Sequence, residues 1–197
     1  MRFLLHSLSL FLLHSCTLSP AGLHSCTLSL RAVQCPETLP DEVLAKMGAP
    51  SKPDDLVATA EQLAEFDGIL FGLSMRFGMA PVQMKSLMDS TGGLWQGGKL
   101  VGKPAGIFFS TAQQGGGQET GALTFVTQLA HHGMIFVPIG YSTPLLFNND
   151  EVHGGSPYGA GTIANGDGSR MPSELEKKVA VHQGKHFGGI VTKLAAT

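Results

Sequence analysis

The sequence predicts an α/β domain built on a doubly wound parallel sheet. Three apolar runs, each bounded by glycine or turn residues, are typical of strands that are buried on both faces. Segments with helical spacing of apolar residues alternate with these runs over short links. Such alternation implies right-handed crossovers and helices on both faces of the sheet. The chain has 197 residues, which is enough for one domain with a substantial core.

The apolar patterns predict the following elements in chain order: a short helix over about 54–65, a strand at 68–73, a helix at 80–89, a strand at 105–110, a helix at about 119–132, a strand at 134–139 and a long helix from Ser173. In the helix at 119–132, the expected core-facing stripe is Ala122, Leu123, Val126, Leu129 and Ala130. The last helix opens with Ser173 and Glu176 at the spacing of a capping box. Its expected apolar face is Leu175, Val179, Phe187, Ile190, Val191 and Leu194.

Residues 1–30 differ from the rest of the chain and are treated as a divergent segment that precedes a domain at 31–197. The seven residues at 13–19 recur unchanged at 23–29, and this biased repetition is typical of low-complexity sequence. Residues 3–13 form an apolar run after one positive charge, which resembles a secretory signal. The run is too short for a membrane span, and no suitable cleavage region follows it. Low complexity is therefore favoured over secretion.

Charge and cysteine content exclude several functional classes. The net charge is −2, and no run of lysine or arginine exceeds two residues, so neither nucleic acid nor an anionic membrane is expected to bind through charge alone. The three cysteines all lie within the first 35 residues. An odd number in this position argues against a disulfide scaffold and favours a reducing compartment. No metal-binding spacing is present, so no metal site is expected.

Three loops rich in glycine and hydrogen-bonding side chains follow the three predicted strands. They are residues 74–79, residues 110–119, and a long stretch from Gly140 to Arg170. In open parallel sheets, ligands bind beyond the carboxyl ends of the strands, so these loops are expected to form one crevice. Exposed backbone amides in such a crevice suit a flat heterocycle, and Arg76 and Phe77 add a cation and an aromatic face. The alternative is a set of ordinary connecting loops.

Two further features allow more than one interpretation from the residues alone. His131 and His132 end a predicted helix, where a favourable interaction with the helix dipole explains a histidine better than catalysis does. A shared metal site is disfavoured because neighbouring helical residues point about 100° apart. Trp95, the only tryptophan, lies in a predicted connecting loop. Exposure at a site and burial as a packing anchor are both compatible with that position.

Eight short motifs occur in order and at the spacing of one known family. They are residues 36–40, 76–78, 91–95, 115–119, 131–134, 137–141, 154–159 and 166–170. Through them the chain closely resembles the WrbA-type NAD(P)H:quinone oxidoreductases in their plant-like form, from about Arg31 to the end.

The resemblance implies a flavodoxin-like, five-stranded parallel sheet in a three-layer α/β/α arrangement, with bound FMN and a homotetrameric assembly. It implies two-electron reduction of a quinone to a hydroquinone, with NADH or NADPH as co-substrate. Both would stack in turn at one site, so ping-pong kinetics are expected. A cytoplasmic location is implied, and peripheral attachment to a membrane, where quinones reside, stays open.

The resemblance also implies roles for individual residues. The residues expected to contact the flavin are Met75, Arg76, Phe77, Gly78, Ser110, Thr111, Ala112, Gln113, Gln114, Gly115 and His131. His131 matches the flavin-site histidine of the family, so the resemblance overturns the helix-dipole interpretation. Arg76 and His131 are the expected catalytic residues, with Arg76 stabilising negative charge on reduced flavin. Trp95 matches the tryptophan on the substrate side of the flavin.

The chain departs from the family in three places. The family opens with a strand, a phosphate-binding loop and a helix, and here an atypical N-terminal segment replaces the first strand and the loop. Residues 14–17 are most similar to the loop but lack its glycine and the following helix, and residues 3–13 as an apolar substitute for the strand are not favoured. Residues 73–75 and 112–113 also differ from the usual flavin loops, and Ala112 would be strained if its φ were positive. Two alternatives follow: a degenerate homologue that binds FMN weakly and acts as a non-catalytic interaction protein, or a misassigned exon at residues 1–30.

Overall fold

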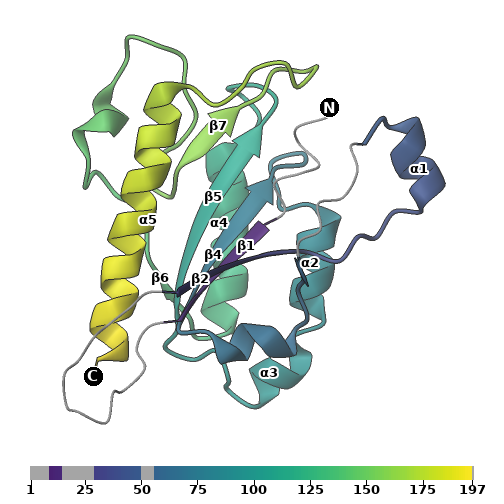
Figure 1. Cartoon of the computed structure of the whole chain (residues 1–197), viewed down its shortest axis with the longest axis vertical. Coiled ribbons are helices and arrows are strands. Elements are labelled where there is room, and N and C mark those ends of the chain that lie inside the picture. Colours follow the sequence, from purple (N-terminus) through teal and green to yellow (C-terminus); the bar gives the residue numbers. More distant parts are fainter. Residues whose placement is uncertain (1–8, 15–28, 50–55, 197) are drawn as a thin grey trace.

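The computed structural model describes residues 9–14, 29–49 and 56–196, with the backbone alone for 9–14. A seven-stranded sheet lies at its centre, in the order β3-β2-β1-β4-β5-β6, with β7 also paired to β5 (Figure 1). The strands are β1 (Ser9–His14), β2 (Ser29–Gln34), β3 (Leu56–Val57), β4 (Gly68–Ser74), β5 (Pro104–Thr111), β6 (Ile135–Phe136) and β7 (Gly161–Ile163). The helices are α1 (Asp41–Lys46), η1 (Glu61–Glu65), α2 (Val82–Asp89), α3 (Gly92–Gln96), α4 (Gln118–His131), η2 (Pro144–Phe147) and α5 (Glu174–Ala195).

Strands β4 and β5 form the buried centre of the sheet. They pair in parallel from Ile69 opposite Ala105 to Ser74 opposite Ser110, and every residue of β4 is buried. Both strands lie where the sequence predicts them, because continuous apolar runs with glycines at close-packed positions suit a strand that is covered on both faces. The α/β fold class is confirmed.

Strand β1 was not expected. It lies between β2 and β4 and runs antiparallel to both, with Leu10 opposite Phe71 on one side and Val33 on the other. The sheet is therefore mixed rather than wholly parallel, although β2 still runs in the same direction as β4. The boundary expected at residue 31 falls inside β2. Apart from the ends that belong to β1 and β2, the repeated segments at 13–19 and 23–29 lie outside the described residues.

Two predicted elements differ from the structure, and one observed strand was not predicted. The helix expected at about 54–65 is wrong: residues 56–57 form edge strand β3 beside β2, and only 61–65 turn, as the 3₁₀ helix η1. The strand expected at 134–139 is reduced to β6, because the edge of β5 is shared by β6 at its start and β7 near its end. The sequence did not predict β7, whose three residues are hidden in a glycine-rich stretch.

The helices cover the two faces of the sheet unequally. Helices α2 and α4 pack on one face with the large cluster that contains Ile69, Phe71 and Ile107. Helix α5 lies on the opposite face (Figure 1). It packs against Leu70 and Val137 mainly through Phe187 and Val191, and the short helix η2 packs near its start. No helix among the residues that the structure describes is both long enough and apolar enough to cross a bilayer.

The three long helices confirm most of the sequence patterns. Helix α2 begins at Val82, two residues later than expected, because Pro81 forms its N-cap. The capping box of α5 is present, and all of its expected apolar face except the exposed Leu194 is at least partly buried. The expected stripe of α4 is partly wrong: Leu123 and Ala130 are exposed, and the unpredicted Phe125 is buried against Phe71.

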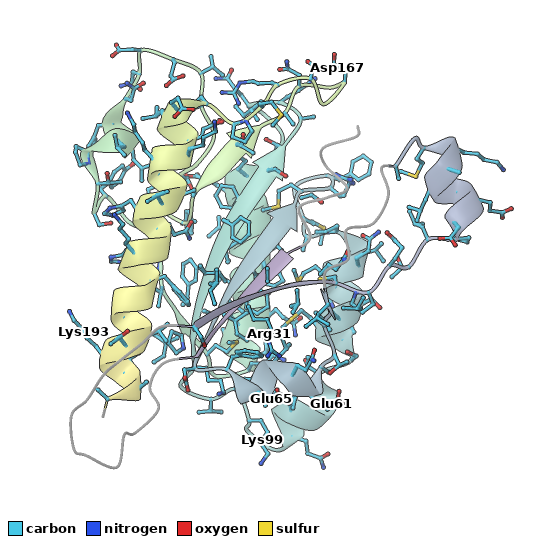
Figure 2. All side chains as sticks on the ribbon, in the orientation of Figure 1. Arg31, Glu61, Glu65, Lys99, Asp167 and Lys193 are labelled. Carbon is cyan, nitrogen blue, oxygen red and sulfur yellow. The ribbon has the colours of Figure 1, made fainter. Side chains whose placement is uncertain are left out.

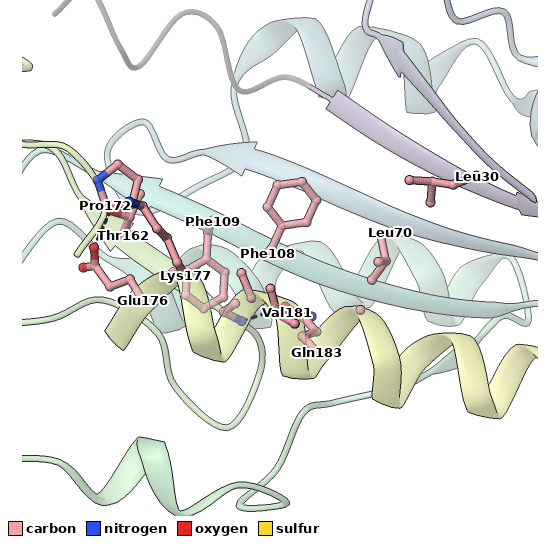
Figure 3. Close-up of a pocket in the computed structure, with 14 residues that line it drawn as sticks. Leu30, Leu70, Phe108, Phe109, Thr162, Pro172, Glu176, Lys177, Val181 and Gln183 are labelled. Carbon is pink, nitrogen blue, oxygen red and sulfur yellow. Dashed lines mark hydrogen bonds between the residues drawn. The ribbon is translucent and has the colours of Figure 1, made fainter. Parts of the chain in front are cut away.

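An apolar hollow of about 470 Å³ lies between the long helix α5 and the strands (Figure 3). Leu70 and Phe108 contribute from the strands, Ala180 and Val181 from the helix, and Leu30 closes the end near β2. A doubly wound sheet with two helices on this face would fill such a space.

Filling the hollow should stabilise the fold. Ala180→Leu adds apolar volume to its wall, so the free energy of unfolding should rise by about 1 kcal/mol, given about 0.8 kcal/mol per buried CH₂ group. The midpoint of thermal unfolding should then rise by about 2–4 °C. Lys178→Leu, on an exposed position of α5 that does not line the hollow, is the control and should give no such gain. Destabilisation by Ala180→Leu would contradict this account.

Candidate functional site

The carboxyl ends of β4, β5 and β7 lie side by side and gather the loops that follow them. Ser74 is opposite Ser110, and Ser110 is opposite Thr162. The backbone of Met75 continues this pairing by donating to the carbonyl of Ser110 at 2.9 Å. The loops therefore start from adjacent points at one edge, which we call the carboxyl edge. Asp167 lies at this edge and Lys99 at the opposite, amino edge (Figure 2).

The first loop is a tight turn that presents Phe77. Arg76 and Met79 exchange backbone hydrogen bonds of 2.9 Å across the turn. The two residues between them have positive φ, 50° for Phe77 and 73° for Gly78, and the Phe77 side chain is fully exposed. A non-glycine residue in this conformation is strained and is often found at functional sites. The turn therefore displays an aromatic ring at the carboxyl edge.

Arg76 is half-buried beside this turn. Its guanidinium Nη1 donates to the carbonyl of Met75 at 3.2 Å. Burial lowers the pKa of Arg76 from its ordinary value, although an arginine side chain stays protonated in proteins. No carboxylate partner of Arg76 is observed within the described residues, so the positive charge is available to an anion at this edge.

The first loop packs directly on the start of α4. A Cβ atom at Gly117 would lie 2.6 Å from the Cα atom of Gly78, and Gly117 has a φ of 82°. A Cβ atom at Gly121, one turn into α4, would collide with the side chain of Met75. Only glycine permits this approach of two backbones. The first and second loops consequently share one rim of exposed backbone.

Gln118 joins the second loop to the third. Its side-chain Nε2 donates to Thr111 Oγ1 at 2.9 Å and to the carbonyl of Thr162 at 3.0 Å. Its Oε1 accepts from the backbone N–H of Gly155 at 2.8 Å. The sequence placed Gln118 in a family motif without giving it a role, and its contacts now identify it as a positioning residue.

A buried carboxylate holds the remaining part of the third loop. Glu176 accepts from the backbone N–H of Gly154 at 2.8 Å, from Thr162 Oγ1 at 2.8 Å and from Arg170 at 3.0–3.1 Å. Burial raises the pKa of Glu176, but the hydrogen bonds from Gly154, Arg170, Ser173 and Thr162 outweigh it and lower the pKa below its ordinary value. The sequence predicted only the helix-capping role of this residue.

The expected flavin contacts in the first two loops lie together at this edge. They are Met75, Arg76, Phe77 and Gly78 in the first loop and Ser110, Thr111, Ala112, Gln113, Gln114 and Gly115 in the second. Ala112 does not have positive φ, so the strain considered for this position is absent. A polar hollow beside the second loop is lined by Gln114, Gly117, His153 and Ser156.

His131 and Trp95 lie away from these loops. His131 ends α4, whose 14 residues span about 20 Å from the carboxyl edge, and its side chain is exposed at the amino edge. Trp95 lies in α3, which follows the end of α2 at the same amino edge, and 61% of its surface is exposed. The packing-anchor interpretation of Trp95 is therefore wrong, and so is its placement in a loop. Within one protomer, His131 and Trp95 lie at the opposite edge of the sheet from Arg76.

His132 has a structural role that the sequence did not reveal. Its side chain is buried, and Nε2 lies 2.8 Å from Thr91 Oγ1. Since Thr91 donates its own hydrogen to the carbonyl of Met88 at 2.5 Å, His132 must donate to Thr91 from Nε2. Nδ1 is then a buried acceptor with no partner among the described residues. The described residues also hold no group of three or more histidine, cysteine, aspartate and glutamate side chains that suits a metal ion.

Comparison with known proteins identifies related chains. The family model "NADPH-dependent FMN reductase" matches residues 18–144. The quinone oxidoreductase QR2 of Triphysaria versicolor is 59% identical over 165 residues, which are 83% of this chain and 80% of that protein. The NAD(P)H quinone oxidoreductase PST3 of Candida albicans is 55% identical over 162 residues, 81% of each chain. A WrbA-like flavodoxin structure from Agrobacterium tumefaciens aligns with a TM-score of 0.50 at 20% identity, covering 68% of this chain and 71% of its own, and supports the fold.

The buried His132 should make stability depend on pH. Burial, and secondarily the charge of His131, lowers the pKa of His132. Below about pH 6.5, His132 therefore binds a proton in the unfolded chain but not in the folded chain. The stability that this histidine contributes above that pH is lost as the pH falls towards its pKa in the folded state. The free energy of unfolding measured in urea should therefore fall between pH 7.5 and 5.5.

His132→Gln keeps an N–H donor for Thr91 but does not titrate near neutral pH, so it should show a smaller loss over the same interval. His186→Gln, on α5 at the other face of the sheet, is the control and should behave like the wild type. An equal pH dependence in His132→Gln and the wild type would remove this explanation.

Proposed function

This chain belongs to the NADPH-dependent FMN reductase family, among its WrbA-type members, and from that membership we propose that it is an FMN-dependent NAD(P)H:quinone oxidoreductase. Relatives named as quinone oxidoreductases are 50–59% identical to it over four fifths of its length. The observation that carries the proposal is the meeting of loops 74–79 and 110–119 in one rim of exposed backbone at the carboxyl edge. This is the place where doubly wound sheets bind their ligands.

The residues at this edge fit FMN. The glycine contact between Gly78 and Gly117 leaves backbone amides without side chains in front of them, as a flat ring requires. Arg76 supplies a positive charge without a bound carboxylate, and Ser74 has a buried hydroxyl without a partner in the described part of the chain. Both groups suit a ligand that combines a polarisable ring with hydroxyls and a phosphate.

When bound, FMN supplies the two-electron chemistry by which NADH or NADPH gives up a hydride and a quinone becomes a hydroquinone. The residues of the protein would bind the cofactor and orient the substrates. The backbone at 110–115 lies beside the turn 75–78, and these two segments would hold the flavin ring. Arg76 would stabilise negative charge on the ring. The exposed Phe77 ring provides an apolar surface on which a planar substrate can stack. A single stacking place used in turn gives ping-pong kinetics.

His131 and Trp95 need a second copy of the chain to take part. Both lie at the amino edge of their own protomer and both are exposed, so they can complete a carboxyl edge only in trans. The homotetramer implied by the resemblance provides such a neighbour. We therefore assign His131 as a flavin contact, and Trp95 as the substrate-side aromatic, of an adjacent subunit.

The cysteines support a proposed location in a reducing compartment. Residues 36–197 contain none, and the buried Cys35 has a pKa raised to about 12 by burial, so it is a poor partner for oxidation. A reducing compartment such as the cytoplasm fits this chain, and quinones would reach it there or at a membrane surface.

Flavin binding and quinone reduction test the proposal together. The purified chain should show flavin absorbance after addition of FMN, and it should reduce a soluble benzoquinone with NADPH or NADH. Arg76→Met removes the charge beside the ring, so it should make the flavin reduction potential more negative and lower kcat/KM about tenfold or more. Arg31→Met, in β2, is the matched control and should leave both unchanged. A colourless protein that stays without flavin in excess FMN would instead indicate the non-catalytic homologue.

Assembly tests the shared site. Light scattering of the eluting protein should give four times the mass of the chain. His131→Ala should weaken FMN binding in that assembly without changing the unfolding of the protomer, because the side chain is exposed and makes no described contact that holds the fold. A monomer with full quinone reductase activity would exclude the assignment of His131 and Trp95 to a neighbour.

A further inference from the structure

Ser74 carries a buried hydroxyl that the fold does not use. Only 1% of the residue is exposed, and its Oγ has no hydrogen-bond partner within the described part of the chain. Native proteins leave few such groups, because a buried hydroxyl without a hydrogen-bond partner destabilises the fold. A buried hydroxyl without a described partner at the carboxyl edge calls for a functional explanation.

The position of Ser74 is set by strand register. Ser74, Ser110 and Thr162 are opposite one another on three adjacent strands and point to the same face of the sheet. That face is the one covered by α5, because Thr162 Oγ1 donates to Glu176 of α5 at 2.8 Å. Three hydroxyl side chains thus form a row at the carboxyl edge, at the end of the apolar hollow that Thr162 and Glu176 line (Figure 3).

The described neighbours of this row already have other partners. The Thr162 hydroxyl is committed to Glu176, and on the other face the Thr111 hydroxyl donates to the carbonyl of Gln113 at 2.8 Å and accepts from Gln118. Ser74 is the last residue of β4, directly before the turn that presents Phe77. The side chain of serine has one χ1 torsion, and one of its rotamers directs the hydroxyl along the strand towards the carboxyl edge.

We propose that the Ser74 hydroxyl binds the ribityl phosphate chain of FMN. This inference rests on the proposed function. The ring is expected against the turn 75–78 and the backbone of 110–115, so a hydroxyl one residue earlier, on the α5 face, meets the part of the cofactor that leaves the ring. A serine can both donate to a phosphate oxygen and exchange hydrogen bonds with a ribityl hydroxyl. Ser74 is thus a cofactor-binding residue at one of the positions where the chain departs from the family pattern.

Three flavins separate the parts of the cofactor. FMN has the ring, the ribityl chain and the phosphate; riboflavin lacks the phosphate; lumiflavin has the ring alone. Dissociation constants are measured for each by quenching of flavin fluorescence, with the full-length wild type, Ser74→Ala and Thr91→Val. Thr91 is buried like Ser74, but its hydroxyl is paired with Met88 and His132 at the amino edge. The unfolding midpoint of each flavin-free protein is measured in parallel.

For Ser74→Ala we expect a Kd for FMN that is about five- to tenfold higher than in the wild type, with an unchanged Kd for lumiflavin. A raised Kd for riboflavin places the contact on the ribityl chain, and an unchanged one places it on the phosphate. The flavin-free variant should unfold at the wild-type midpoint or above it, because it loses an unpaired buried hydroxyl. Thr91→Val should do the reverse: lower midpoint and unchanged flavin affinity.

Two binding results overturn the proposal while the proposed function stands: an unchanged Kd for FMN in Ser74→Ala, or an equal weakening for all three flavins, which would place the contact on the ring. A lower midpoint of flavin-free Ser74→Ala also overturns it, because the hydroxyl would then have a structural partner. If the wild type binds none of the flavins, the proposed function itself fails. The two failures are therefore distinguishable.

Discussion

The parallel pairing of β4 with β5 is the constraint on which the rest of the structure depends. Six successive residue pairs, from Ile69 with Ala105 to Ser74 with Ser110, fix where both strands end. The loops that leave those ends must then start side by side, and the glycine contact of Gly78 with Gly117 becomes possible only because the register is this one. A shift of one residue would turn every side chain of a strand to the other face and separate the loops.

Polar side chains complete what the strand register begins. Gln118 joins the second loop to β7 and to Gly155, while Glu176 joins Gly154, Thr162 and Arg170 to the start of α5. Both residues are buried and have their hydrogen bonds satisfied, so each holds segments that are distant in sequence. The edge is consequently rigid at its base, and the exposed Phe77 is carried on a short turn rather than on a long loop.

Sequence patterns identified the central strands and the three long helices because apolar periodicity reports burial, and burial decides those elements. The same rule failed at residues 56–57, where a strand at the edge has exposed apolar residues, and at β7, where three residues are too few to show a period. The ends of the predicted strands located the loops at the carboxyl edge. Motif matching did not reveal that His131 and Trp95 lie at the amino edge, away from Arg76, because a motif does not report where its residues lie in the fold. Nor can a sequence show that the buried Ser74 hydroxyl has no partner within the described part of the chain, because that depends on tertiary contacts.

The reversed direction of β1 has a consequence for how this molecule can be extended. A parallel strand in that slot would receive the chain from the amino edge, but β1 receives it next to Phe71, close to the carboxyl edge. Backbone hydrogen bonds accept a strand in either sense, so the sheet is preserved while the entry point changes ends. A fusion partner joined directly ahead of Ser9 would therefore start near the carboxyl end of β4. One attached after α5 emerges at the far end of the domain (Figure 1).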